Sequence, residues 1–434
     1  MTRLALPMVG AQLGLMAMGV VDTLMVGRVS ADALAAVALG NLVFLFFAFP
    51  SSGTLMVLDP IVAQAVGARD HGAIARGVQR GSVLALLLTV VTSLCLLPVR
   101  PMLGLLHQPP ALMPIASSFV LISILGVFPF LGFVVLRQSL QAFAATRPLL
   151  YVILAANLLN ALLDWVFVYG HWGMSPLGAV GSAWATLISR WAMLFLALGF
   201  GWKHLHHAIV PWRSDSFELA SIRGMLKLGL PIGLHQGLEL GAFAAIGVLM
   251  GVLGTTEMAA HQIAINLASL TFMVPLGVGA AAAVRVGHAV GAGDAEGARD
   301  AARAALFCGA GFMVCAAIVL LAIPAVIARQ YTTDASVLAL AVALIPIAGV
   351  FQVFDGVQAV CAGVLRGLGD TRVPFAINLG GFWLAGFPLS VVLGFHTGAR
   401  ALGLWWGLVA GLGVVSTLLL LRVRQMLRRP LRRV

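Results

Sequence analysis

The chain has 434 residues, of which 61% are hydrophobic and 9% are charged, and its mean hydropathy is +1.04. Soluble domains carry about 25% charged residues, so this composition excludes a soluble globular protein. The formal net charge of +11 would suit a nucleic-acid-binding protein, but the basic residues lie in short loops between apolar runs, which argues against nucleic acid as a partner.

Apolar runs of about 20 residues, the length that crosses a bilayer as a helix, follow one another along the whole chain. Twelve such runs are found, at 4–26, 37–60, 78–99, 113–137, 149–170, 177–200, 226–250, 258–283, 304–328, 337–363, 374–396 and 401–421. The loops between them are too short to form a soluble domain. We therefore predict an all-α polytopic membrane protein with twelve transmembrane helices.

The basic residues are divided unevenly between the two sets of loops. The loops after the second, fourth, sixth, eighth and tenth runs, with both termini, hold nearly all of them, whereas the opposite loops hold Arg28, Arg100, Arg329 and Arg400. Basic loops stay in the cytoplasm, so we expect both termini there. Their charge would attract anionic headgroups, which makes membrane lipids an expected partner.

The two halves of the chain repeat each other. LALPMVG at 4–10 resembles LGLPIGL at 228–234, and QAVGARD at 64–70 resembles HAVGAGD at 288–294, both pairs 224 residues apart. Each half holds six runs, so both have one orientation and are related by a pseudo-twofold axis along the membrane normal. The predicted parts are an N-terminal six-helix lobe at 1–201, a cytoplasmic inter-lobe linker at 202–224, a C-terminal six-helix lobe at 225–422 and a basic cytoplasmic tail at 423–434.

Two acidic residues of the first half lie deep in apolar runs. Asp22 is roughly 27 Å and Asp164 roughly 22 Å along helices that enter from the cytoplasm, so the two carboxylates lie at similar depth. Asn160 and Asn157 lie one and two helical turns before Asp164. Such oxygen ligands suit Na⁺ or a shared proton; the alternative is that both acids approach the outer interface and are hydrated.

The second half carries its own acids, Glu239 in the seventh run and Asp355 in the tenth. By the repeat spacing Glu239 corresponds to Leu15, and Asp22 corresponds to Ile246. Packing of two repeated lobes would not require acids at unmatched positions. We therefore expect Glu239 and Asp355 to serve function, with Na⁺ or H⁺ as the ion.

Two other ionisable residues have less definite roles. Arg190 is the one base deep in a run, and it either pairs with an acid or extends toward the interface. Asp59 lies at the inner end of a run and is expected to anchor its helix there; the alternative is a functional role.

Sequence motifs of enzymes are absent. The chain shows no P-loop, dinucleotide fingerprint, zinc motif or nucleophile elbow. We therefore expect a protein that is not an enzyme and needs no cofactor beyond the coupling ion.

Several short stretches, taken in order, resemble the multidrug and toxic compound extrusion (MATE) family, in its NorM-type bacterial branch. They are VVDTLMVGR at 20–28, VAQAVGARD at 62–70, NALLDW at 160–165, LGAVGSAWAT at 177–186, HQIAIN at 261–266 and LRGLGDTRVP at 365–374. The resemblance implies two six-helix lobes around a cleft, and export of organic cations in exchange for Na⁺ or H⁺. It also implies a location in the bacterial cytoplasmic (inner) membrane, and we expect a monomer.

The resemblance assigns roles at matching positions. Asp22 matches the first-helix aspartate that is implicated in coupling, and Asn160 and Asp164 match the polar pair of the fifth helix. Glu239 and Asp355 match the acids of the C-terminal lobe that are linked to cation binding. Bound Na⁺ would accordingly lie at Glu239 and Asp355, or at Asp22 and Asp164.

Aromatic side chains are the candidates for stacking on planar organic cations. The ones selected for the substrate cleft are Phe47, Phe243, Phe272, Phe351 and Phe354. The alternative for such residues is packing or contact with lipid.

Two other functions compete with drug export. A flippase for a lipid-linked saccharide would favour a cationic cleft, whereas the charges deep in these runs are mainly acidic. A lipid-dependent transferase would show a loop cluster of catalytic acids or bases beside the bilayer, and none is evident.

Overall fold

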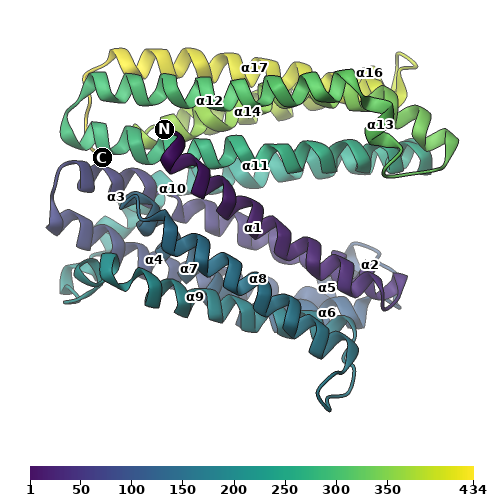
Figure 1. Cartoon of the computed structure of the whole chain (residues 1–434), viewed down its shortest axis with the longest axis horizontal. Coiled ribbons are helices and arrows are strands. Elements are labelled where there is room, and N and C mark those ends of the chain that lie inside the picture. The colour runs from purple at the N-terminus through teal and green to yellow at the C-terminus, as the bar shows by residue number, and fades with distance from the viewer. The chain divides into compact units, whose positions relative to one another are not determined.

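The structure, a computed structural model, describes residues 1–434 and consists of helices without strands. Figure 1 shows the helices coloured from purple at the N-terminus to yellow at the C-terminus. In chain order they are α1 (Thr2–Gly27), α2 (Ala31–Leu55), α3 (Leu58–Gly67), α4 (His71–Leu96), α5 (Val99–Leu105), α6 (Met113–Leu125), α7 (Val127–Ala142), α8 (Thr146–Tyr169), α9 (Ala179–Ile209), the 3-10 turn η1 (Ser214–Phe217), α10 (Leu219–Leu253), α11 (Thr255–Ala292), α12 (Ala295–Ala322), α13 (Pro324–Ala328), α14 (Ala335–Gly367), α15 (Arg372–Asn378), the π-helical turn η2 (Leu379–Gly386), α16 (Phe387–Phe395) and α17 (Arg400–Arg428).

The prediction of twelve transmembrane spans is confirmed, with one span broken. Eleven helical segments are long and apolar enough to cross a membrane, and α6 with α7 supplies the twelfth as a pair bent by 50°. The break falls at Gly126. Pro129, in the first turn of α7, has no N–H to donate to the carbonyl of Leu125, which favours a kink or break at this point.

The repeated motif QAVGARD/HAVGAGD is a helix end followed by a helix start. Arg69 and Gly293 have positive φ angles of 58° and 74°, which end α3 and α11. Asp70 and Asp294 then cap α4 and α12, and their Oδ1 atoms accept from backbone N–H groups at 2.8 Å. The motif recurs because both halves turn sharply at the same place and must satisfy the free N–H groups of the next helix.

Asp294→Ala is expected to lower the free energy of unfolding by about 1 kcal/mol, because it removes the cap of α12. Thermal unfolding of the purified protein in detergent measures this. The matched control is Glu296→Ala, which removes a carboxylate from the same first turn and leaves the cap bond intact. Equal midpoints for the two variants would contradict the assigned role of the cap.

The chain forms two compact units, and in each repeat the boundary follows the repeated proline. One unit comprises Met1–Val9, Gly67–Arg69 and Leu234–Val434, and the other comprises Gly10–Val66 and Asp70–Gly233. We call them the C-unit and the N-unit. The helices α1 and α10 each pass from one unit to the other two residues after a proline, Pro7 and Pro231. A proline inside a helix removes a backbone hydrogen bond and favours bending there.

Within the C-unit, the helices α11, α12, α14 and α17 lie side by side, as the green to yellow ribbons of Figure 1 show. The π-helical turn η2 packs against α17 through facing glycines. A Cβ atom built on Gly411 would lie only 2.6 Å from the Cα of Gly386, so α17 could not carry a side chain at this crossing without moving its neighbour. Small residues allow this close approach of membrane helices.

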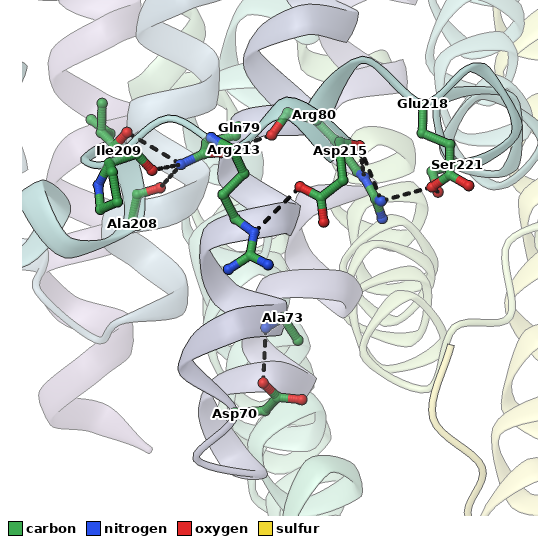
Figure 2. A network of polar contacts seen from close by, with 12 residues as sticks. Asp70, Ala73, Gln79, Arg80, Ala208, Ile209, Arg213, Asp215, Glu218 and Ser221 are labelled. Carbon is green, nitrogen blue, oxygen red and sulfur yellow. Dashed lines mark hydrogen bonds and ion pairs between the residues drawn. The ribbon is translucent and has the colours of Figure 1, made fainter.

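The segment that joins α9 to α10 is held on α4 by hydrogen bonds, as Figure 2 shows. At its centre is Gln79, whose side chain is fully buried. The Gln79 carboxamide donates to the carbonyls of Ala208, Ile209 and Pro211 and accepts from the N–H of Arg213 and the hydroxyl of Ser216, at 2.7 to 3.2 Å. The adjacent Arg80 pairs with Glu218 at 2.9 Å. The segment is thus fixed to the N-unit along its length.

Candidate functional site

The N-unit brings together polar side chains from three helices around Asp22. The Thr186 hydroxyl of α9 donates to Asp22 Oδ2 at 3.2 Å. Asn160 and Asp164 of α8 also interact with the Asp22 side chain, and both are completely buried. We call these four residues the N-site. The sequence prediction that Asp22 and Asp164 lie at similar depth agrees with this arrangement, because the two acids face each other.

Most polar atoms of the N-site have no hydrogen-bond partner in the protein. These are both carboxylate oxygens of Asp164, Oδ1 of Asp22 and both amide atoms of Asn160. Buried polar groups are nearly always hydrogen-bonded in native proteins. Carboxylate and carboxamide oxygens are also the ligands that a small hard cation prefers. The N-site is therefore chemically suited to hold Na⁺ or a proton.

Asn157, predicted as part of the same set, has a different place. Its Nδ2 donates to the carbonyl of Gly14 at 3.0 Å and to that of Ile153 at 2.8 Å. The bond to Gly14 ties α8 to α1, so the Asn157 amide is engaged in helix packing.

Thr186 was not predicted from the sequence, since a single threonine in an apolar run gives no signal of its own.

Arg190 lies on the same face of α9 as Thr186, one turn further along. Its guanidinium carbon lies 4.1 Å from the ring centre of Phe44 and 5.5 Å from that of Phe130. It interacts electrostatically with Asp22. Of the two roles that the sequence left open, the structure therefore favours pairing with an acid over extension toward the interface.

The C-unit holds a second pair of acids, Glu239 on α10 and Asp355 on α14. The two carboxylates interact electrostatically, and Asp355 Oδ1 is buried without a hydrogen-bond partner. His235, one turn before Glu239, places its Nε2 atom 3.7 Å from Glu239 Oε2. We call Glu239 and Asp355 the C-site. Glu239 lies on α10, the repeat counterpart of the α1 helix that carries Asp22, but the two acids occupy different positions of the repeat.

Hydrogen bonds connect Gln358, which lies beside the C-site, to the eleventh span. Gln358 interacts with Glu239 and donates through Nε2 to Asn378 Oδ1 at 3.0 Å. Asn378 in turn donates to the carbonyl of Pro374 at 2.9 Å. Immediately after Asn378 the helix widens into η2, where Trp383 donates to the carbonyl of Leu238 at 3.1 Å. π-Helical turns of this kind are frequent at functional sites.

Asn378→Leu is expected to lower the free energy of unfolding by about 1–3 kcal/mol, because it leaves the buried Nε2 group of Gln358 without an acceptor. The comparison is the double variant Gln358→Leu/Asn378→Leu, which removes the donor and the acceptor together and so leaves no unpaired Nε2 group. Thermal unfolding in detergent compares the two variants. A double variant much less stable than Asn378→Leu would contradict this reading.

The predicted substrate aromatics differ in how accessible they are. Phe351 is 1% exposed, and its ring packs against those of Phe243 and Trp405 at 5.9 and 5.6 Å. It therefore belongs to the core of the C-unit. Phe47, Phe272 and Phe354 are half-buried and keep part of their surface open to contact.

Comparison with known proteins agrees with the fold and with the repeat. The MatE family model matches the chain twice, at residues 7–166 and 231–392. The two matches begin at the repeated prolines, 224 residues apart. The internal duplication predicted from the sequence is thereby confirmed.

Curated relatives match nearly the whole chain. The multidrug resistance protein NorM of Burkholderia vietnamiensis is 38% identical over 425 residues, which cover 96% of this chain and 91% of the relative. A NorM-type protein of Mesorhizobium japonicum is 39% identical over 434 residues, with 96% and 92% coverage.

Solved structures show the same fold at lower identity. The eukaryotic MATE transporter AtDTX14 superposes with a TM-score of 0.88 at 22% identity, covering 98% of this chain and 96% of that one. An outward-facing multidrug resistance MATE family transporter superposes with a TM-score of 0.87 at 20% identity, with 98% and 95% coverage.

Proposed function

Because the chain belongs to the MatE family of multidrug transporters, we propose that it is a secondary active antiporter that exports organic cations in exchange for Na⁺ or H⁺. The observation that carries this proposal is a pair of buried acids in each unit, in which oxygens of Asp22, Asp164 and Asp355 are buried without a hydrogen bond from the protein. Ionisable groups inside membrane spans are costly and mark ion pathways. Groups that alternately take up and release a cation can couple the entry of that cation to the export of the drug.

The energetics of export favour more than one ion per drug molecule. Moving a monovalent cation out against about 100 mV costs about 2.3 kcal/mol, and a hundredfold concentration gradient adds about 2.7 kcal/mol. One proton that enters with the same potential and a tenfold gradient returns about 3.7 kcal/mol. Two entering charges suffice where one does not, which is consistent with a site in each unit.

The cellular arrangement follows from the same reasoning. The bacterial NorM relatives and the basic loops support a location in the cytoplasmic (inner) membrane, with both termini in the cytoplasm. The two predicted lobes, 1–201 and 225–422, would alternate access to the substrate around the bound ions. The chain would act as a monomer surrounded by membrane lipids.

The alternative function, a flippase for a lipid-linked saccharide, requires recognition of a pyrophosphate. Cationic side chains do this best, whereas both sites contain two carboxylates and the N-site has one arginine beside it. The excess of carboxylates over cationic side chains at both sites favours a cationic substrate.

Efflux of ethidium from proteoliposomes tests the proposal, with a Na⁺ gradient and a pH gradient imposed separately. We expect one of the two gradients to drive efflux and thereby to identify the coupling ion. If neither gradient drives efflux by the folded protein, the antiport proposal fails. Scrambling of a lipid-linked saccharide in the same vesicles would then support the flippase.

A further inference from the structure

Arg190 is a positive charge placed beside the N-site that neither the repeat nor the packing of the N-unit explains. Its Nη1 atom is buried without a hydrogen-bond partner and lies 3.2 Å from the position that a Cβ of Gly126 would occupy, at the break between α6 and α7. The rings of Phe44 and Phe130 lie against the guanidinium at 4.1 and 5.5 Å. The bend of the fourth span and these two rings thus lie against the guanidinium.

The aromatic rings alone do not account for a charge at this place. A cation over aromatic faces gains about 0.5–2 kcal/mol, whereas an arginine near the middle of a membrane helix costs about 2.5–3.5 kcal/mol. An arginine also stays protonated in proteins. The remaining stabilisation has to come from negative charge, and the acid on this side of α9 is Asp22, which accepts at 3.2 Å from Thr186, one turn before Arg190.

The charged members of this cluster can be counted. Asp22 and Asp164 each bring one carboxylate, and Arg190, one turn after the Thr186 that bonds to Asp22, brings one guanidinium. Thr186 and Asn160 contribute neutral groups. With both carboxylates ionised the cluster has a net charge of −1. A single monovalent cation, either a proton or Na⁺, makes it neutral.

From this count we infer that Arg190 is a fixed counter-charge that limits the Asp22–Asp164 pair to one exchanged positive charge per transport cycle. The inference rests on the proposed antiport function and specifies its stoichiometry in the N-unit. Without the guanidinium, the same two carboxylates reach neutrality only with two bound cations. Arg190 is thus a positioning and charge-setting residue and not a ligand of the ion.

The test counts bound cations on the purified full-length protein and does not depend on transport. The parent carries Glu239→Gln and Asp355→Asn, so that the C-site takes up no ion. Radioactive Na⁺ bound per chain is measured at saturation, and in Na⁺-free buffer the protons taken up are measured by potentiometric titration. The reference is a chain that also carries Asp22→Asn, Asp164→Asn and Arg190→Met.

Charge balance predicts the number of cations bound by each variant. The parent and its Arg190→Lys derivative bind one cation per chain, Arg190→Met binds two, and Asp164→Asn binds none. The double variant Arg190→Met/Asp164→Asn again binds one cation per chain. It loses one positive and one negative charge, so the cluster keeps its net charge of −1. A merely structural role of Arg190 would not restore the count in this way.

A count of one for folded Arg190→Met, or of one for Asp164→Asn, overturns the inference. If Arg190→Met does not fold, the number of cations bound by Asp164→Asn still tests the inference. Arg190 balances the remaining Asp22 carboxylate in that variant, so no cation should bind, whereas an unbalanced Asp22 would bind one. Failure of the antiport proposal is separate from these outcomes, since it appears as absent gradient-driven ethidium efflux in the unmodified chain.

Discussion

Asp22→Asn and, independently, Asp355→Asn are expected to lower ion-driven efflux of ethidium by about a hundredfold or more, the usual effect of removing a group that carries a proton in a reaction cycle. Asparagine keeps the size of the side chain and one oxygen, but it cannot release a proton or balance the charge of Na⁺. Because each residue belongs to a different pair of acids, each single variant should impair coupling. Efflux from proteoliposomes under the driving gradient is the measurement.

Asp32→Asn is the matched control for these variants. Asp32 is an exposed aspartate in the first turn of α2, away from both sites, and its substitution should leave efflux unchanged. Full gradient-driven efflux by the folded Asp22→Asn variant would remove the N-site from the coupling mechanism. The same result for Asp355→Asn would remove the C-site.

Gln79→Leu is expected to lower the free energy of unfolding by at least about 3 kcal/mol, because each buried polar group left without its partner costs about 1–3 kcal/mol. The substitution removes the acceptor of the Arg213 N–H and the Ser216 hydroxyl. It also removes the donor of three backbone carbonyls of the segment between α9 and α10. Thermal and denaturant unfolding in detergent, followed by tryptophan fluorescence, measure the loss.

The control for Gln79→Leu is Gln108→Leu. The Gln108 carboxamide donates only to the nearby carbonyl of Leu106, at an exposed position. This change should alter stability by about 0.5 kcal/mol or less, as surface substitutions usually do. Limited proteolysis adds a second readout, because the released segment of the Gln79 variant should be cut at Arg213. Equal stability and equal protease resistance of the two variants would show that Gln79 does not hold the segment.

Some features of the fold follow from the sequence because their causes are local. Apolar runs of membrane-spanning length predicted the twelve spans, and the repeated prolines predicted the duplication that the family model confirms. The break at Gly126 does not show in the hydropathy pattern, since the run at 113–137 carries no charged residue before Arg137. Hydropathy measures the preference for lipid and is insensitive to a bend that depends on one missing N–H group.

The site was predicted only in part, for a reason that particular residues illustrate. Asn157 and Asn160 are three positions apart on α8, yet one bonds to the Gly14 carbonyl and the other faces Asp22. Thr186 and Asn378 have no charge to attract notice, and they acquire roles through partners more than 15 positions away. Phe351 is an aromatic residue of the kind that can stack on a planar cation, but its side chain is buried in the core of the C-unit.

The sequence by itself determined the class of protein, the number of spans, the duplication and the acids that stand inside the spans, because each of these depends on residue type and spacing along one helix. The tertiary structure alone decided which acids face each other, that Arg190 lies beside Asp22, and that Gln79 holds the segment between α9 and α10. The energy of a buried charge or carboxamide is set by the groups around it, and those groups come from helices far apart in the chain.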